Sequence, residues 1–163
     1  MESLIILFFM MLLGFIFLIY FAAIVLTLVC NWKLFEEANE EGWKALIPFY
    51  NTYISCGIVG LNKNWVWIMV INALVSIAFS VIPIIGTLLS VITMSINIYF
   101  AIILNISKAR AFSKSDEFSI GLILLPVVFL PILAFGKHKY IGSSKPCKDP
   151  FMDFINKNIL KKN

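Results

Sequence analysis

Long uncharged blocks dominate the pattern of hydrophobic and polar positions, and the charged residues fall between them. No charged side chain interrupts residues 64–107, which form the longest block. At 1.5 Å of helical rise per residue, these roughly 44 residues extend ~66 Å, about twice the 30 Å hydrocarbon core of a bilayer. Proline and glycine occur in the block only near its middle, at Pro83 and Gly86. The pattern therefore predicts two transmembrane helices, 65–82 and 84–106, joined by a tight turn.

Two further apolar runs are candidates for crossings. Residues 4–29 form a run of about 26 residues, which suffices for a tilted transmembrane helix. Glu2 precedes it, whereas a cleaved signal peptide begins with basic residues and ends at a small-residue cleavage site, so we expect an uncleaved anchor. Pro126 and Pro131 interrupt a shorter run, 118–135. A fourth crossing is the favoured interpretation of this run, and a re-entrant loop kinked at the two prolines is the alternative.

The segment that follows the first crossing is amphipathic. From 33 to 47, apolar residues recur at helical spacing, and four glutamates and Lys44 occupy the other face. This pattern predicts an interfacial helix. Two pairs of opposite charge lie four residues apart on it, Lys33–Glu37 and Glu40–Lys44. Pro48 ends the helix, and residues 54–61 are too few to cross, so we expect a shallow elbow in the interface rather than a fifth crossing.

Composition places the chain in the same class. It is 61% hydrophobic and 13% charged, with a mean hydropathy of +0.95, whereas soluble domains are about 45–50% apolar and 25% charged. We therefore expect an all-α polytopic integral membrane protein of the cell membrane, with about four transmembrane helices and one interfacial amphipathic helix. Residues 1–142 would form a helical membrane domain. Residues 143–163 would form a basic amphipathic tail, with a short helix that begins at Asp149–Pro150.

The distribution of charge raises a conflict about topology. Basic residues near the ends of crossings mark the cytoplasmic side. Lys33 after the first crossing therefore predicts an external N-terminus, and two more crossings return Lys108, Arg110 and Lys114 to the cytoplasm. One further crossing then puts the lysine-rich tail outside, against the same rule. The lipid bilayer is the expected partner of these lysines, through its anionic headgroups, and no nucleic acid is expected.

Few residues carry recognisable chemistry. Cys30, Cys56 and Cys147 lack the paired spacing of a disulfide framework or a zinc site, so we interpret them as free thiols. The single histidine, His138, stands in a basic run that we expect to be solvated. Adjacent serine–lysine pairs point in different directions on a helix or strand, and no ionisable relay exists within 64–107. We therefore expect no catalytic, cofactor-binding or metal-binding residues and no cofactor.

Polar side chains inside the two central crossings form candidate stripes. Asn72, Ser76 and Ser80 are four residues apart on the first of these helices. A similar line on the second includes Ser90 and Asn97. Such stripes can face each other and form interhelical hydrogen bonds, worth ~0.6–2 kcal/mol each. Ordinary packing is the favoured interpretation, and a hydrophilic pathway centred on Asn72 and Asn97 is the alternative.

A second candidate site is a structural joint in the segment Gly42-Trp43-Lys44-Ala45-Leu46-Ile47-Pro48-Phe49-Tyr50-Asn51. Gly42 permits the close approach of a neighbouring element, and Trp43 suits the headgroup region. Pro48 turns the chain, and Asn51 can satisfy backbone groups that the turn frees. Tyr50 adds a polar group that a crossing helix would lack. We expect a structural role for these residues rather than ligand binding.

This segment resembles the G-W-x-x-x-I-P-x-Y-N signature of an uncharacterised family of small prokaryotic multi-pass membrane proteins. Residues 111–122, with Pro126 downstream, and residues 134–142 carry the rest of the resemblance. Ser113 stands where the resemblance leads us to expect glycine. Some members of that family carry signal-peptidase-like labels, but no catalytic dyad can be matched here. The resemblance implies an all-helical membrane domain and supplies no settled activity.

Three classes of function remain. The favoured hypothesis is a non-enzymatic multi-pass membrane protein that acts through partners, such as an accessory or immunity-type factor, bound to a membrane protein or to a second copy. A small transporter subunit or a holin-like pore is the alternative, and a membrane-embedded enzyme is the third. The small size, the lack of catalytic groups and helix faces suited to association favour the first.

Overall fold

The described part of the chain is made of helices and connecting segments, without a strand. The computed structural model describes residues 2–79, 82–142 and 148–158. Its elements, in chain order, are α1 (Glu2–Glu37), the 3₁₀ helix η1 (Gly42–Leu46), α2 (Tyr50–Val59), α3 (Trp65–Phe79), α4 (Pro83–Ala111), α5 (Asp116–Leu124), α6 (Pro126–Phe135) and α7 (Pro150–Asn158). The predicted all-helical class is confirmed.

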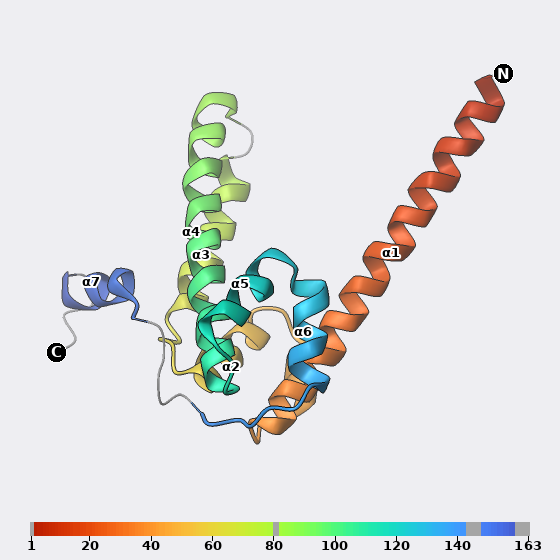
Figure 1. The fold of residues 1–163 in the computed structure, drawn as a ribbon. Coiled ribbons are helices and arrows are strands. Elements are labelled where there is room, and N and C mark those ends of the chain that lie inside the picture. Colours follow the sequence, from red (N-terminus) through yellow and green to blue (C-terminus); the bar gives the residue numbers. More distant parts are fainter. Residues whose placement is uncertain (1, 80–81, 143–147, 159–163) are drawn as a thin grey trace.

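Two long helices stand out by length and composition. The segments Ser3–Glu37 and Ile84–Ala111 are long and apolar enough to cross a bilayer, and α3 is a shorter apolar helix. α3 and α4 run side by side as a hairpin, and α1 diverges from them (Figure 1). Pro83 occupies the first turn of α4, where its missing N–H costs no hydrogen bond. The run is therefore divided into two helices near Pro83, as predicted, with α3 ending at Phe79 and α4 beginning at Pro83 where the prediction had residues 82 and 84.

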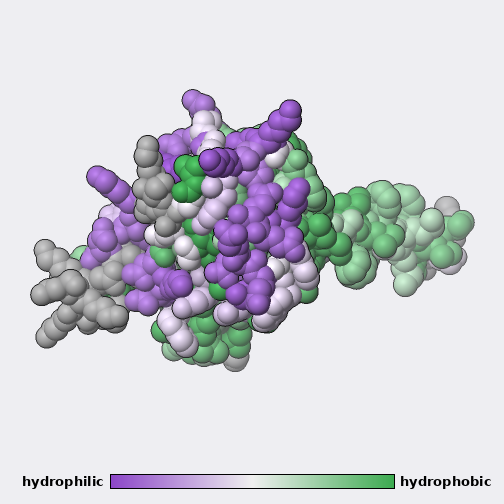
Figure 2. All heavy atoms as spheres, turned by 90° about the horizontal axis from the view of Figure 1, so that it is seen from below, coloured by the Kyte–Doolittle hydropathy of each residue, from purple (hydrophilic) through white to green (hydrophobic). Residues whose placement is uncertain are grey.

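The buried core lies at one end of the molecule, which we call the packed end. The last turns of α1, together with η1, α2, the start of α3, the end of α4, α5 and α6, meet there (Figure 1). Phe35, Trp65 and Phe112 are among its fully buried side chains. Viewed from below, this end is covered mostly by hydrophilic residues, and the apolar length of α1 projects beyond it (Figure 2). Packing and polar surface therefore coincide, away from the projecting apolar lengths of α1, α3 and α4.

The predicted interfacial helix 33–47 is wrong as a single element. α1 continues to Glu37, and η1 then folds back against α1. Asn39 makes the reversal with φ of 60°, and the Glu40 N–H donates to the Phe35 carbonyl at 2.9 Å. Asparagine tolerates this left-handed conformation, which ends many helices. Helical periodicity on both sides of the reversal concealed it.

Only one of the two predicted charge pairs forms. Lys44 Nζ lies 2.7 Å from the Glu40 carboxylate. The Glu40 side chain is the main reason that the pKa of Lys44 is raised. Lys33 instead places its ammonium 4.5 Å from the centre of the Phe135 ring, in α6. Glu37 also bonds elsewhere, as described below. Lys33 and Glu37 therefore contact other elements and not each other, although they lie four residues apart on α1.

The expectation that residues 118–135 form a single crossing does not match the path of the chain. The run is divided into α5 and α6, of 9 and 10 residues, or ~14–15 Å each, about half the thickness of a bilayer core. Leu125 leaves helical geometry, and Pro126 starts α6. The two helices fold back on each other, with the Phe118 and Phe129 rings 5.3 Å apart. This path matches the re-entrant alternative.

The tail helix α7 begins at Pro150, as the Asp149–Pro150 pair predicts. Asp149 accepts hydrogen bonds from the Trp65 indole at 2.5 Å and from the Tyr99 hydroxyl at 3.2 Å. The Phe151 ring packs 5.4 Å from the Trp65 ring. The start of the tail helix is therefore attached to α3 and α4.

Candidate functional site

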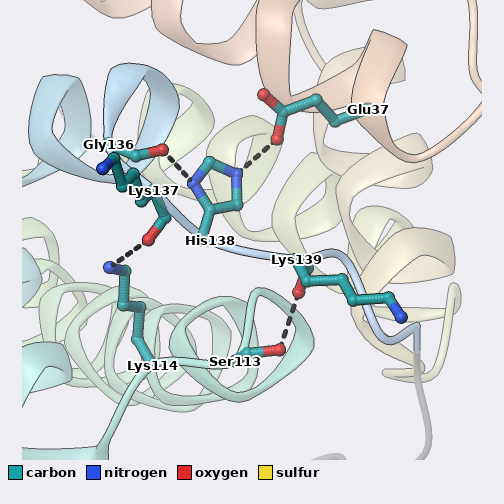
Figure 3. Close-up of polar contacts among 7 residues, drawn as sticks. All are labelled: Glu37, Ser113, Lys114, Gly136, Lys137, His138 and Lys139. Carbon is teal, nitrogen blue, oxygen red and sulfur yellow. Dashed lines mark hydrogen bonds and ion pairs between the residues drawn. The ribbon is translucent and has the colours of Figure 1, made fainter.

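A short segment after α6, residues 136–142, closes the packed end, and we call it the strap. The Ser113 hydroxyl donates to the Lys139 carbonyl at 2.7 Å, and the Lys114 ammonium donates to the Lys137 carbonyl at 3.1 Å (Figure 3). The Ile141 N–H donates to the Ala111 carbonyl at 2.9 Å. The residues just before α5 are therefore bonded to those just after α6, so the segment between them leaves and returns at the same end of the molecule.

Ser113 occupies a position that favours glycine. Its φ is 56°, in the left-handed region, and the Lys114 N–H donates to the Ala109 carbonyl at 2.8 Å across the end of α4. Helices commonly end in this way with glycine at the left-handed residue. This geometry accounts for the glycine expected at this position from the resemblance. Serine has a less favourable backbone there and gains the hydrogen bond to the strap.

The side chain of His138 is buried, and the expectation that it is solvated is wrong. Its side chain is 3% exposed and contacts the Glu37 carboxylate at the end of α1 (Figure 3). Its other ring nitrogen lies 2.8 Å from the Gly136 carbonyl, and its ring packs 5.4 Å from the ring of Phe112. The partners are 101 residues apart in sequence, so no local pattern pointed to the pair.

Tyr140 attaches the strap to α2. Its hydroxyl donates to the Ile58 carbonyl at 2.9 Å, and its ring lies 5.2 Å from the ring of Phe112. Burial, with a smaller contribution from the Glu40 carboxylate, raises the pKa of this hydroxyl. Together with His138, this contact makes the strap the common neighbour of α1, α2 and α4.

The candidate joint is built around a close contact of Gly42. A Cβ at Gly42 would lie 2.2 Å from the Trp32 indole nitrogen, so any larger residue would displace that ring. After Pro48, Asn51 donates from Nδ2 to the Ala45 carbonyl, 3.0 Å away in η1. Trp43 is exposed and donates to Glu41. Tyr50, the first residue of α2, stacks on Tyr53 with ring centres 6.1 Å apart. These contacts join η1 to α1 and α2.

The candidate polar stripes make one described hydrogen bond between the two helices. Asn72 Nδ2 donates to the Thr93 carbonyl at 3.4 Å. Ser76, Ser90 and Asn97 each donate to a carbonyl of their own helix, at 2.7–2.9 Å. Ser90 and Asn97 are exposed, and Ser80 lies outside the described residues. The structure therefore brings Asn72 against α4 but leaves Ser90 and Asn97 on the surface.

Sequence reasoning missed a contact between α1 and α4. Asn31 is 7% exposed, and its amide oxygen accepts a hydrogen bond from the Lys108 ammonium at 3.3 Å. Its amide nitrogen donates to the Thr27 carbonyl at 3.0 Å. Lys108 reads in the sequence as a solvated loop residue, and neither its spacing nor its neighbours indicated this partner.

The described cysteines are structural. Cys30 and Cys56 are free and fully buried. Burial raises the pKa of the Cys56 thiol to about 12, so it stays protonated and weakly reactive at neutral pH. Cys147 lies outside the described residues. Within residues 2–79, 82–142 and 148–158, no three His, Cys, Asp or Glu side chains are grouped so that they could hold a metal ion.

Comparison with known proteins gives one match. A family described as a family of unknown function (DUF5684) matches residues 43–143. The matched region begins within η1 and ends just after the strap, so it contains α2 to α6 and leaves out α1 and α7. No match was found among curated proteins or among solved structures.

Proposed function

The chain belongs to DUF5684, a family of unknown function, and we propose that it is a non-enzymatic integral membrane protein that binds a partner within the bilayer through α4. The partner is another membrane protein or a second copy of this chain. Such a protein is an accessory or immunity-type factor of a prokaryotic cell membrane. The proposal has two parts, the placement in the bilayer and the surface that meets the partner.

In the proposed placement α1, α3 and α4 cross the bilayer, and α5–α6 is a re-entrant hairpin. The charged residues of 33–44, 108–117 and 136–142 then lie on one side, at the packed end. Glu2 stands alone on the other side. Basic residues mark the cytoplasmic face, so the packed end is cytoplasmic and the N-terminus external. The conflict noted in the sequence disappears, because the tail no longer needs a fourth crossing.

Asn97 is the observation that carries the proposed partner surface. It lies near the centre of α4, is exposed, and donates one amide hydrogen to the Thr93 carbonyl at 2.9 Å. Its amide oxygen accepts no hydrogen bond within the described residues. An exposed carboxamide on a helix that crosses the bilayer is unfavourable in lipid and favourable against a neighbouring helix that donates to it. Ser90, two turns away on the same side, is exposed as well.

Site-specific photo-crosslinking at position 97 in intact membranes tests this surface. Position 95 is the matched control, since Ser95 is exposed on the same helix and bonds the Val91 carbonyl of its own backbone at 2.8 Å. The two positions lie ~160° apart around the helix axis. We expect an adduct with a second protein molecule at 97. At 95 we expect adducts with lipid or within the chain, since Ser95 lines a hollow with Trp65 and Phe151. Mass spectrometry then distinguishes a second copy from a different protein.

Equal adducts at both positions, or lipid alone at 97, would contradict the partner surface. A conduit is tested in parallel by solute leakage from vesicles that contain the purified chain. Leakage that disappears in the Asn72→Leu/Asn97→Leu variant would favour the small transporter subunit or holin-like pore instead. Ser76, Ser90 and Asn97 donate hydrogen bonds to carbonyls of their own helices. These bonds favour the partner-binding proposal over a conduit.

A further inference from the structure

A groove of about 550 Å³ runs along α1 where its apolar length meets the packed end. Val25, Leu28 and Val29 line it on the α1 side. Leu46 of η1 and Phe135 of α6 line it from the other elements. Cavities of this size hold small organic ligands or part of a lipid. The groove exists because η1 folds back and α6 packs beside α1, so no sequence pattern announced it.

The groove ends at a pair of opposite charges. Lys33 and Glu36 both line it and, three residues apart, share one face of α1. The Lys33 ammonium is held 4.5 Å from the centre of the Phe135 ring and makes no ion pair within the described residues. Glu36 accepts a hydrogen bond from the Trp32 indole at 2.6 Å through Oε1, and its other oxygen accepts none from the part of the chain that the structure describes. A cation and a carboxylate oxygen are therefore available side by side at the mouth of an apolar groove.

We propose that the groove binds one phospholipid with a phosphoethanolamine headgroup. An acyl chain lies along Val25, Leu28 and Val29. The Lys33 ammonium donates to the lipid phosphate, and the lipid ammonium donates to Glu36. The inference rests on the proposed membrane placement, which puts the apolar part of the groove in the hydrocarbon and the charged pair at the cytoplasmic headgroups.

Charge complementarity selects this occupant over other lipids. Phosphoethanolamine carries one phosphate and one N–H-bearing cation, which match Lys33 and Glu36 in sign and in hydrogen-bonding role. A glycerol headgroup brings the phosphate without the cation and leaves Glu36 beside a negative charge. A choline headgroup is cationic but has no N–H to donate. The eight steps of helical rise from Val25 to Lys33 span ~12 Å, which accommodates roughly half an acyl chain along the helix.

Native mass spectrometry of the full chain, delipidated in detergent, provides the test. Phosphatidylethanolamine, phosphatidylglycerol and phosphatidylcholine with the same acyl chains are titrated separately. We expect phosphatidylethanolamine to bind about tenfold more tightly than the other two. Lys33→Gln should weaken the binding of all three lipids. Glu36→Gln should remove the preference for phosphatidylethanolamine and leave phosphatidylcholine binding unchanged.

Two further variants separate a built site from general stickiness. Glu40→Gln removes a carboxylate of the same α1–η1 region that does not line the groove, and it should leave all three affinities unchanged. Val25→Trp fills the groove without changing charge and should weaken all three lipids. Circular dichroism of each variant checks that the helices are retained. Equal affinity of the parent chain for the three lipids, or a preference that survives Glu36→Gln, would overturn the inference.

The placement is tested separately by extraction of membranes with alkaline carbonate. A chain that stays in the membrane but shows no headgroup preference refutes the lipid site and leaves the proposed function standing. A chain that is released by carbonate refutes the placement and with it the proposed function. The two failures are therefore distinguishable.

Discussion

The molecule contains two apolar helical hairpins, and each has a proline in the first turn of its second helix. In α3–α4 the helices have 15 and 29 residues and project away from the packed end (Figure 1). In α5–α6 they have 9 and 10 residues and remain within it. Hydrophobicity does not separate the two, since both are strongly apolar. The two hairpins are distinguished by the position of the break within the apolar run.

The two hairpins are also closed differently. One described side-chain hydrogen bond joins α3 to α4, from Asn72 to the Thr93 carbonyl. The ends of α5–α6 are tied together by Ser113, Lys114 and the strap. The break in the long run leaves helices of 15 and 29 residues, of which α4 is long enough by itself to cross a bilayer, while the break in the short run leaves two helices that are too short. The return of the short hairpin then sets the side on which the tail lies.

The largest expected effect concerns that side. A membrane-impermeant maleimide should label Cys147 only after cells are permeabilised, because in the proposed placement α5–α6 returns the chain to the cytoplasmic side. Cys30 and Cys56 are fully buried and should not react. As a control, Ser3→Cys in a Cys147→Ser chain should be labelled in intact cells. Labelling of Cys147 in intact cells would show that residues 118–135 cross after all.

A bulkier residue at Gly121 should force the short hairpin open. A Cβ there would lie 2.3 Å from the Phe129 ring. We expect Gly121→Ala to lower the free energy of unfolding by ~1–3 kcal/mol, since the ring must leave its place. Gly14→Ala is the control, because no atom lies within 4 Å of a Cβ there. Denaturant titrations in mixed micelles measure both, and Phe129→Leu should partly rescue Gly121→Ala.

Two substitutions at Ser113 should separate backbone strain from the bond to the strap. Ser113→Ala keeps the left-handed backbone and loses the hydrogen bond to Lys139, so we expect a loss of ~1 kcal/mol. Ser113→Gly loses the same bond but relieves the backbone, and its free energy of unfolding should be near that of the parent. Both should speed amide hydrogen exchange in the strap. Equal destabilisation by the two would argue against strain at this position.

The long hairpin should be less sensitive to loss of its cross-helix bond. Asn72→Leu removes the hydrogen bond to the Thr93 carbonyl, and such bonds average ~0.6 kcal/mol in membranes. Ser76→Ala, which removes a bond within α3, is the matched control. Thermal unfolding in detergent compares the two. A loss at Asn72 as large as that expected at Gly121 would contradict the distinction between the hairpins.

The smallest expected effect is a dependence of local stability on pH at the start of α5. The Arg110 guanidinium, which is 2.7 Å from Asp116, lowers the pKa of that carboxyl below its usual 3.8. Because the folded pKa is depressed, the pair contributes above pH ~4 and its contribution is lost as the pH falls through the folded value. Amide hydrogen exchange around residues 113–118 should become faster as the pH falls through that pKa. Asp116→Asn should remove this pH-dependent increase. A rise of the same size in Asp116→Asn would assign it to another group.

The two hairpins also differ in how much of their structure the sequence patterns predicted. Trp65 was placed correctly at the start of α3, and a break near Pro83 was predicted correctly, because an uninterrupted apolar run and a proline act locally. Pro83 itself was predicted in the turn and is the first residue of α4. The segment 33–47 was misread because its periodicity persists on both sides of the reversal at Asn39. Asn51 was expected to bond backbone freed at the turn, and it reaches the Ala45 carbonyl. The identity of that acceptor depends on how η1 is placed, which the sequence does not specify.

The sequence by itself determined the helical class and the existence of long apolar helices at α1 and α4, since both follow from uninterrupted hydrophobic runs. Their ends, at Glu37 and Ala111, lie beyond the predicted residues 29 and 106. Only the tertiary structure decided that α5–α6 returns, that His138 is buried against Glu37, and that Asn97 stays on the surface. The bonds that settle the first two join residues 23–101 positions apart. Contacts over such distances leave no periodic trace in a single chain, because they arise from the way the helices pack and not from any one helix.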